Sequence, residues 1–308
     1  MNGRMPHPVP YQGSKRNIAE HILRFFPLDT EGLYEPFAGS AAITIAAASR
    51  GKAEHFFVND LNEPLIELWH AIVHSPSRLS ANYTQLWNAQ IGRERSFYDD
   101  IRRLFNETHR PELLLYLLAR CVKASVRYNS SGEFNQSPDN RRLGRNPAQM
   151  KSDLFGVSHL LRGRTALSAH DFAKSVETAT PRDLVYMDPP YQGTSGNRDG
   201  RYIKGLNVGA LTDLLAKLNA RDISYILSYD GHCGATKYGD ALPKELTLYH
   251  LLIDAGVSSQ GTLLGRSETT YESLYLSPAL VERIELSAKY HGSILTKEQV
   301  SQLPLELA

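Results

Sequence analysis

Cysteine is scarce in this chain of 308 residues, and no apolar run is long enough to cross a membrane. The two cysteines, Cys121 and Cys233, have no CxxC partner, and the eleven histidines show no HExxH spacing. A disulfide framework and a metal site are therefore not expected. The amino-terminal residues lack the apolar core of a signal peptide. With 42% hydrophobic and 22% charged residues, the composition predicts a soluble globular protein of the cytoplasm.

The chain also lacks a strong overall charge, because its formal net charge is only +1. Charge is nevertheless uneven along the sequence. Between residues 120 and 164 there are nine Lys or Arg residues and three acidic residues. A local excess of this size fits a surface that contacts phosphates, and it fits a solvated basic loop equally well.

Short apolar segments alternate with helical patterns along most of the chain. The segments expected to form strands are 33–37, 55–59, 165–168, 183–187 and 222–228. Continuous apolar strands that alternate with helices predict an α/β fold with a mostly parallel sheet. After residue 245, the runs ELTLYHLLI and YESLYLSP predict an antiparallel hairpin at the edge of that sheet.

The middle of the chain, about residues 62 to 150, departs from this alternation. PLIELWHAIV, SANYTQLWNAQI and PELLLYLLARCVKASV read as helices, and the last is apolar nearly all round, which predicts a buried helix. The segment RYNSSGEFN follows and predicts a hairpin that turns at residues 130–132. Near the end of the chain, Thr296 and Gln299 form a capping-box pattern that predicts a last short helix.

The sharpest motif is the tetrapeptide Asp188-Pro189-Pro190-Tyr191, directly after the strand DLVYM. Ligands in open α/β sheets bind at the carboxyl ends of strands. Consecutive prolines fix the backbone, so the turn presents a carboxylate, an unpaired carbonyl and an aromatic face together. An exocyclic amine on a nucleobase needs two acceptors and a stacking surface. An ordinary Pro-Pro turn after a strand is the alternative.

A second motif, residues 35–42 (EPFAGSAA), follows a strand and opens a helix. Small residues there let the backbone approach a ligand at the helix amino terminus. The pattern is neither GxGxxG nor GxxxxGK, which argues against a plain dinucleotide or phosphate loop. A tight turn between strand and helix explains the small residues as well.

Three further short motifs have both a functional and a structural explanation. Asn59-Asp60 ends the next strand, where an acid can accept hydrogen bonds from ribose hydroxyls or can cap a helix. The run 11–15 (YQGSK) brings Lys15 beside a glycine turn, which suits a carboxylate ligand or a surface lysine. Asp171-Phe172 can bond and stack an adenine, or can supply a helix cap and a core aromatic.

Taken together, these residues resemble the N6-adenine DNA methyltransferases of the Dam type, also called the D12 class. YxGSK, EPFAGS, ND, a helical insertion with RYNxxGEFN, a DF pair and DPPY occur in the order of that family. The resemblance runs from about residue 8 to 278, where GRSETTYESLYLSP is similar to the closing strand pair of the family. Six motifs in the right order over nearly the whole chain are far more specific than any one of them.

The resemblance implies a Rossmann-like sheet of seven strands, mainly parallel, that binds S-adenosylmethionine. Residues 1–61 and 160–308 would form the catalytic domain, and 62–159 a helical insertion that recognises DNA, with the hairpin near 127–136. Lys15 would meet the methionine carboxylate of the cofactor, Asp60 its ribose, and Asp171 with Phe172 its adenine. The residues implied in cofactor binding are Tyr11, Lys15, Glu35, Phe37, Ala38, Gly39, Ser40, Asp60, Asp171, Phe172 and Asp188.

The resemblance also implies a reaction, in which the target adenine is flipped out of the duplex. Asp188 and the Pro189 carbonyl would accept the two N6 hydrogens, next to Pro190, and Tyr191 would stack on the base. The implied DNA contacts are Arg127, Tyr128, Asn129, Asn135, Arg141, Arg142 and Arg145. Double-stranded DNA is then the partner and a monomer the expected state. A bacterial or phage origin is expected, and an accompanying restriction endonuclease is left open.

One departure from the family bears on specificity. Members that methylate GATC often follow EFN with Val-Pro-Phe-Gly, but here residues 136–139 are Gln-Ser-Pro-Asp, so GATC is not assumed. The competing interpretations are an inactive module that binds the cofactor or DNA, and an enzyme acting on cytosine N4 or on RNA adenine. A protein-glutamine methyltransferase more usually has Asn at the position of Asp188. An intact Lys15 and DPPY favour an active enzyme on DNA adenine.

Overall fold

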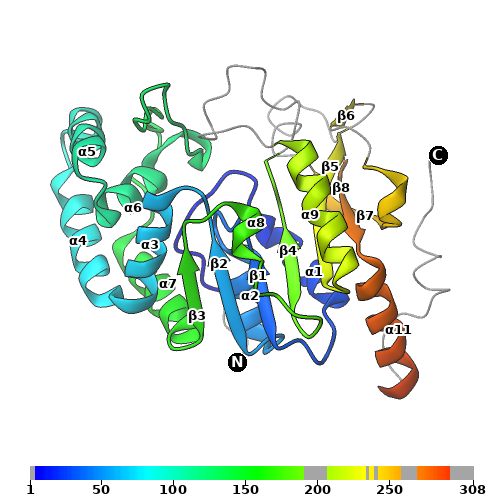
Figure 1. Ribbon diagram of the computed structural model, residues 1–308. Helices are drawn as coiled ribbons and strands as arrows, with labels where there is room; N and C mark the ends of the chain where they lie inside the picture. Colours follow the sequence, from blue (N-terminus) through cyan, green and yellow to red (C-terminus); the bar gives the residue numbers. More distant parts are fainter. Residues whose placement is uncertain (1–3, 191–206, 234–235, 239–241, 258–268, 292–308) are drawn as a thin grey trace.

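The computed structural model describes residues 4–190, 207–233, 236–238, 242–257 and 269–291 (Figure 1). Side chains are described for all of these except residues 230–241, 254–270 and those after 286. Tyr191 and the capping box predicted at Thr296 and Gln299 lie outside the described residues. In the part of the chain that is described, no helix has the length and hydropathy needed to traverse a bilayer.

A single sheet organises the molecule, in the strand order β3-β2-β1-β4-β5-β8-β7, with the short strand β6 paired to β5. Strands β1 to β5 are parallel, whereas β8 is antiparallel to both of its neighbours. The predicted α/β fold is confirmed, as is the hairpin of β7 and β8 at the sheet edge. The strands are β1 (Gly32–Glu35), β2 (His55–Asn59), β3 (Thr165–Ser168), β4 (Leu184–Met187), β5 (Ser224–Cys233), β6 (Thr236–Tyr238), β7 (Tyr249–Val257) and β8 (Thr269–Leu276).

Both faces of the sheet are covered, and the strand residues alternate between the two layers. In β4, Leu184 and Tyr186 pack into one cluster of apolar side chains, whereas Val185 and Met187 pack into the other. This alternation is the two-residue repeat of a strand that is buried on both faces, which explains its continuous apolar sequence. Helices α8 (Phe172–Ser175) and α9 (Val208–Ala220) lie over one face. Helices α1 (Ala19–Ile22), α2 (Ala42–Arg50) and α11 (Pro278–His291) lie over the other.

A group of helices stands beside β3, at one end of the sheet (Figure 1). Its members are α3 (Glu63–His74), α4 (Pro76–Ala89), α5 (Glu94–Thr108), α6 (Pro111–Arg120) and α7 (Pro147–Leu161). The sequence predicted α3, α4 and the buried α6, but not α5 or α7. Helix α6 is shorter than expected because Cys121 is extended and both Lys123 and Ala124 have positive φ. Apolar side chains of these helices join those of α2 and β2 in one cluster.

The hairpin predicted after α6 is present as a short antiparallel bridge between Tyr128 and Phe134. The Asn129 amide donates to the carbonyl of Glu133 at 2.9 Å, and that of Asn135 donates to the carbonyl of Arg127 at 3.0 Å. Gly132 has φ +78°, a backbone conformation that glycine adopts without strain.

The strand order reverses direction between β1 and β4, because the chain adds β2 and β3 on one side and continues with β4 and β5 on the other. In open α/β sheets, ligands bind outside the carboxyl ends of strands at such a point. Glu35 ends β1, and Asp188 follows directly on β4. The fold therefore brings the EPFAGS and DPPY motifs to the position where a binding site is expected.

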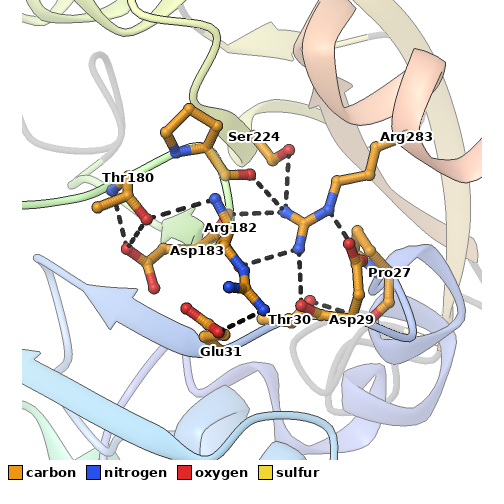
Figure 2. A network of polar contacts seen from close by, with 10 residues as sticks. Pro27, Asp29, Thr30, Glu31, Thr180, Arg182, Asp183, Ser224 and Arg283 are labelled. Atoms are coloured by element: carbon orange, nitrogen blue, oxygen red, sulfur yellow. Dashed lines mark hydrogen bonds and ion pairs between the residues drawn. The ribbon is translucent and has the colours of Figure 1, made fainter.

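At the opposite, amino edge, Arg283 of α11 holds the loops that enter β1, β4 and β5 (Figure 2). Its guanidinium donates to the Asp29 carboxylate at 3.0 Å and to the hydroxyl of Ser224 at 3.4 Å. It also donates to the backbone carbonyls of residues 29, 181, 182 and 183 at 2.9 to 3.1 Å. Only 13% of this side chain is exposed, so a buried charge is surrounded by oxygen acceptors.

Candidate functional site at the carboxyl edge of the sheet

The centre of the site is a buried lysine between two carboxylates. Lys15 Nζ lies 3.2 Å from Oδ1 of Asp188 and 3.3 Å from Oε2 of Glu272. The exposed fractions of the side chains are 6% for Lys15, 21% for Asp188 and 18% for Glu272. Three segments that are far apart in sequence meet here: the 3₁₀ turn η1 (Lys15–Asn17), the end of β4 and strand β8. Asp188 is thus presented by a strand end and a buried proline, Pro189, with a cation directly behind it.

The pKa of Asp188 lies close to neutral pH. Burial raises the pKa of Asp188 to about 6; the Lys15 ammonium opposes this rise and the Glu272 carboxylate adds to it. Burial penalises the charged form of the carboxyl group, whereas a cation at this distance favours it. At pH 7 Asp188 is mainly a carboxylate that can accept a hydrogen bond or a proton.

Glu35 is a second carboxyl group at the same edge, and it is only 3% exposed. Its Oε2 accepts hydrogen bonds from the amide of Thr44 at 3.0 Å and from the Thr44 hydroxyl at 2.6 Å. Burial raises the pKa of Glu35 to about 8; the bonds from Thr44 oppose the rise and the charge on Asp188 adds to it. Glu35 is therefore mainly protonated at neutral pH, and its contact with α2 fixes the start of the EPFAGS turn.

The EPFAGS turn is closed by contacts on all sides. Gly39 has φ +48°, and a Cβ added there would lie 3.0 Å from the ring of Tyr11. The carbonyl of Gly39 accepts a hydrogen bond from Trp69 Nε1 at 2.9 Å, and the Ser40 hydroxyl donates to that of Ser14 at 2.7 Å. The ring of Tyr11 occupies the space that a side chain at residue 39 would need, and the predicted approach of a ligand to the backbone of this turn stays a prediction. Glycine is required here for its backbone angle and for the aromatic ring.

Asn59, buried at the end of β2, connects the loops after three neighbouring strands. Its Nδ2 donates to the carbonyls of Pro36 and His170, each at 3.0 Å. Its Oδ1 accepts from the Ser168 hydroxyl at 2.7 Å and from the amide of His170 at 2.8 Å. All four hydrogen-bonding positions of the side-chain amide are thus used. The sequence identified Asn59 only as the neighbour of Asp60, because a connecting role of this kind leaves no local pattern.

Asp60 faces the EPFAGS turn. Its Oδ2 accepts from the amide of Gly39 and its Oδ1 from the amide of Asn62, both at 3.0 Å. Burial raises the pKa of Asp60, and the two amide donors oppose that rise. The carboxylate stabilises the turn and the segment that enters α3, but the N-cap of α3 is Asn62, so Asp60 is not the helix cap given as the structural alternative. Each carboxylate oxygen has further acceptor capacity, so the predicted ribose contact stays a prediction.

Two aromatic rings lie side by side beyond this turn. Phe37 and Phe172 stack with their centroids 5.2 Å apart, and both are partly exposed. Asp171 precedes Phe172, is exposed, and caps α8 by accepting from the amide of Ala173 at 2.9 Å. A partly exposed aromatic pair beside an exposed carboxylate has the chemistry to hold a purine by stacking and hydrogen bonding. The residues present therefore fit an adenosine-type cofactor.

The residues predicted to contact DNA fall into two groups in the hairpin. Arg127 and Asn135 are exposed. Tyr128 is only 6% exposed, and its hydroxyl donates to Asn62 Oδ1 at 3.1 Å. Asn129 closes the turn, because its Oδ1 accepts from the amides of Ser131 and Glu133, both at 2.9 Å. Tyr128 is thus a core residue and Asn129 a turn residue, and neither is retained among the proposed contacts.

The arginine-rich segment after the hairpin divides in the same way. Arg141 and Arg142 are 79% and 73% exposed, and both pair with the carboxylate of Asp139. Arg145 is only 17% exposed, and it bonds the Asp153 carboxylate and the carbonyl of His7. Arg145 therefore fastens the amino-terminal segment to α7. We remove it from the predicted DNA contacts because its charge is already paired inside the protein.

Comparison with known proteins identifies a family over most of the chain. The model of the D12 class N6 adenine-specific DNA methyltransferases matches residues 11–252. That span contains every motif from Tyr11 to Asp188, and it ends before Glu272.

Curated relatives match the same part of the chain. A DNA N-6-adenine-methyltransferase of Escherichia phage P1 is 29% identical over 72% of this chain and 29% of its own length. The type II methyltransferase M1.LlaDCHI of Lactococcus lactis subsp. cremoris is 28% identical over 59% of this chain and 64% of its own length. A DNA adenine methylase of Haemophilus influenzae is 26% identical, over 59% and 63%. Each match spans less than two thirds of the relative.

Proposed function

Because the chain belongs to the family of D12 class N6 adenine-specific DNA methyltransferases, we propose that it transfers a methyl group to N6 of adenine in double-stranded DNA. The observation that carries this proposal is the buried pair of Lys15 and Asp188 at the strand reversal between β1 and β4. A carboxylate fixed beside a Pro-Pro turn at such a point has the chemistry that an exocyclic amine requires.

S-adenosylmethionine is the proposed donor, and when bound it would supply a methyl group on a positively charged sulfur. Lys15 and the turn of Phe37, Ala38 and Gly39 would lie along its methionine moiety. Asp60 would accept from its ribose, and Phe172 with Asp171 would hold its adenine. The stacked rings of Phe37 and Phe172 and the exposed carboxylate of Asp171 support this assignment.

Asp188 and the carbonyl of Pro189 would accept the two hydrogens of the target N6. Hydrogen bonds to both hydrogens draw the nitrogen lone pair out of conjugation with the ring and direct it toward the incoming methyl group. Positioning and electrostatics account for most of the acceleration in such a displacement. As N6 is methylated it becomes acidic, and the nearby carboxylate of Asp188 takes up the proton.

The target adenine would leave the base stack to reach this edge of the sheet. In the sequence, Tyr191 directly follows the two prolines, and its ring is the proposed stacking partner for the flipped base. Stacking of a base on an aromatic side chain contributes about 1–3 kcal/mol.

Residues 62–159 are proposed as the part of the protein that recognises DNA. Arg127 and Asn135 would read base edges, and Arg141 and Arg142 would contact phosphates. The exposure of these four side chains supports the proposal. The relatives include an enzyme of a phage and a type II methyltransferase of a bacterium, so we propose that this protein is a cytoplasmic enzyme of a bacterium or a phage. We propose that it acts as a monomer and that, in a restriction-modification system, a restriction endonuclease would be its functional partner.

The test is methylation of a plasmid that lacks N6-methyladenine, with purified protein and S-adenosylmethionine, read by long-read sequencing. Modified adenine within one short sequence is the expected result, and it would also identify the target. The matched control is the Asp188→Ala protein, which should bind the plasmid and leave it unmodified. Modified cytosine would replace the proposed target base, and an unmodified plasmid with wild-type protein would contradict the proposal.

A further inference from the structure

Glu272 lies in the stretch YESLYLSP, but the sequence assigned it no role, and it lies outside the matched span of residues 11–252. It stands on β8, opposite Gly231 of β5 and Ile253 of β7. The register between β5 and β8 shifts between Ser228 and Gly231. An irregularity of this kind in a ladder re-aims the side chains beside it and occurs frequently next to active sites.

The contacts of Lys15 give Glu272 its role. A lysine that is 6% exposed would be costly without partners, and here two carboxylates lie within 3.3 Å of the ammonium group. Glu272 and Asp188 both pair with the same ammonium group. Because Lys15 is a flexible side chain, a second anion fixes where its charge sits relative to Asp188. Without Glu272, the ammonium group would pair with Asp188 without a competing anion and would move toward it.

We propose that Glu272 is a positioning residue that shares the Lys15 ammonium group with Asp188 and thereby sets the charge with which Asp188 faces the target amine. The inference rests on the proposed function for the identity of that amine. The cluster itself is defined by the two ion pairs of Lys15 and does not depend on that function. Glu272 acts through Lys15 and through its own field, and it need not touch either substrate.

The groups around Asp188 determine the sign of the effect. Lys15 of η1 lowers its pKa, Glu272 of β8 raises it, and Glu35 of β1 is near enough for the two carboxyl groups to interact. Strand β5 pairs with β4 as far as Leu227, which lies opposite Met187, the residue before Asp188. Removing the charge of Glu272 should therefore lower the pKa of Asp188 and make it a weaker proton acceptor. Removing the charge of Lys15 should have the opposite effect.

A bond forms between N6 and the methyl carbon, and the bond between that carbon and sulfur breaks, its electron pair staying on sulfur. N6 then loses one proton, which Asp188 accepts and later releases to water. Glu272 and Lys15 return unchanged. The strength of Asp188 as an acceptor is the quantity on which Glu272 acts.

The experiment follows the titration of Asp188 directly in the free protein, without DNA or cofactor. Aspartate labelled at the side-chain carboxyl carbon is incorporated, the Asp188 signal is assigned by its loss in Asp188→Asn, and its carbon-13 shift is followed against pH. The midpoint should move down in Glu272→Gln and up in Lys15→Met. Glu282→Gln, an exposed carboxylate on α11, is the matched control and should leave the midpoint unchanged. An unmoved midpoint in Glu272→Gln would overturn the proposal.

A second readout is the single-turnover rate with plasmid DNA across the same pH range. The Glu272→Gln rate at neutral pH should fall about tenfold, within the ~10²-fold loss that misplacing a reacting group can cause. On the acid side of the pH–rate profile, the fall in rate should move to lower pH. Glu272→Asp keeps the negative charge on a shorter side chain, so it should lower the rate without shifting the profile. If both variants fail to fold, Glu272 is a structural residue and the proposal is overturned. A wild-type protein that titrates as expected but modifies no adenine would refute only the proposed function.

Discussion

At the amino edge of the sheet, Arg283 donates to a carboxylate, a hydroxyl and four backbone carbonyls, whereas at the carboxyl edge Lys15 lies between Asp188 and Glu272 with Glu35 nearby. Both edges hold buried cations paired with acids from distant parts of the chain. At the amino edge the acceptors are mostly carbonyls, which carry no net charge. At the carboxyl edge they are carboxylates: the charge of Glu272 raises the pKa of Asp188, and the charge of Asp188 raises the pKa of Glu35.

The amino edge is built for stability, whereas the carboxyl edge is built for proton transfer. A guanidinium surrounded by neutral acceptors is satisfied without repulsion, and the loops that enter three strands are held together. Two carboxylates on one ammonium leave an excess of negative charge in a buried place, which costs stability but keeps a proton acceptor near neutral pKa. The expected effects of substitution should differ accordingly at the two edges.

The largest effect is expected for Asp188→Ala. Turnover should fall by about 10³-fold or more, because the proton acceptor and its hydrogen bond to the amine are both removed. The free energy of unfolding should stay the same or rise, since a buried carboxyl group with a raised pKa is lost and Lys15 keeps Glu272. Single-turnover methylation and urea unfolding measure the two quantities. A variant with near-normal turnover would contradict the mechanism.

Arg283→Ala should show the reverse pattern. We expect the free energy of unfolding to fall by roughly 2–4 kcal/mol, because several charge-assisted hydrogen bonds disappear and their buried acceptors lose a donor. Turnover per folded molecule should be unchanged. Arg283→Lys retains the charge but not the planar set of donors, so it should recover only part of the loss. Equal stability in all three proteins would show that the amino edge is not held in this way.

Glu35→Gln tests the cost of a protonated acid at the carboxyl edge. The pKa of Glu35 is raised from 4.5 to about 8 in the folded protein, so the unfolded chain loses its proton first as pH rises. The stability that this group contributes is fully present below 4.5 and is lost as pH rises through 8. Relative to wild type, Glu35→Gln should gain stability over that window, by more than ~1 kcal/mol. Urea midpoints at pH 5 and pH 8.5 give the difference, and a pH-independent gap would count against it.

The smallest effect is expected for Arg141→Ala, which tests how much the effect of an arginine substitution depends on burial. Arg141 pairs with Asp139 as Arg283 pairs with Asp29, but it is 79% exposed against 13%. Thermal stability should therefore be unchanged. Affinity for DNA should fall about three- to tenfold, and the slope of log affinity against log salt should decrease by about 0.9. Fluorescence anisotropy across a salt series measures this, with Arg145→Ala as the contrasting variant that should instead destabilise the protein.

The fold could be predicted from the sequence because its strands are buried on both faces and therefore appear as continuous apolar runs. The helices α5 and α7 were missed for a related reason. Helix α5 is rich in charged residues, and its apolar stripe of Phe97, Ile101 and Phe105 is narrow. Helix α7 follows an arginine-rich loop, where turn residues dominate the local signal. The end of α6 could not be predicted, since residues 121–124 adopt a backbone that contradicts their helical preference.

Site residues could be predicted from the sequence where they belong to a motif of the family. They could not be predicted where their role depends on a contact between distant segments. Lys15, Glu35, Asp60 and Asp188 were identified by local patterns, but the pairing of Lys15 with Asp188 and Glu272 was not. Local charge counts were also misleading, because three of the nine basic residues between 120 and 164 are wholly or partly buried. Arg120 is buried, Arg145 binds Asp153, and Arg164 lies over the ring of Phe56. Sequence reveals the charge of a residue but not its exposure.

The amide of Asn59 has a consequence for motion. Because one side chain binds the loops after β1 and β3 and lies at the end of β2, none of these loops opens without breaking bonds to the others. Local opening is then a single cooperative event rather than three independent ones. The amide hydrogens of Ala38 and His170, which bond the backbone and side-chain oxygens of Asn59, should exchange with solvent deuterium at one common free energy.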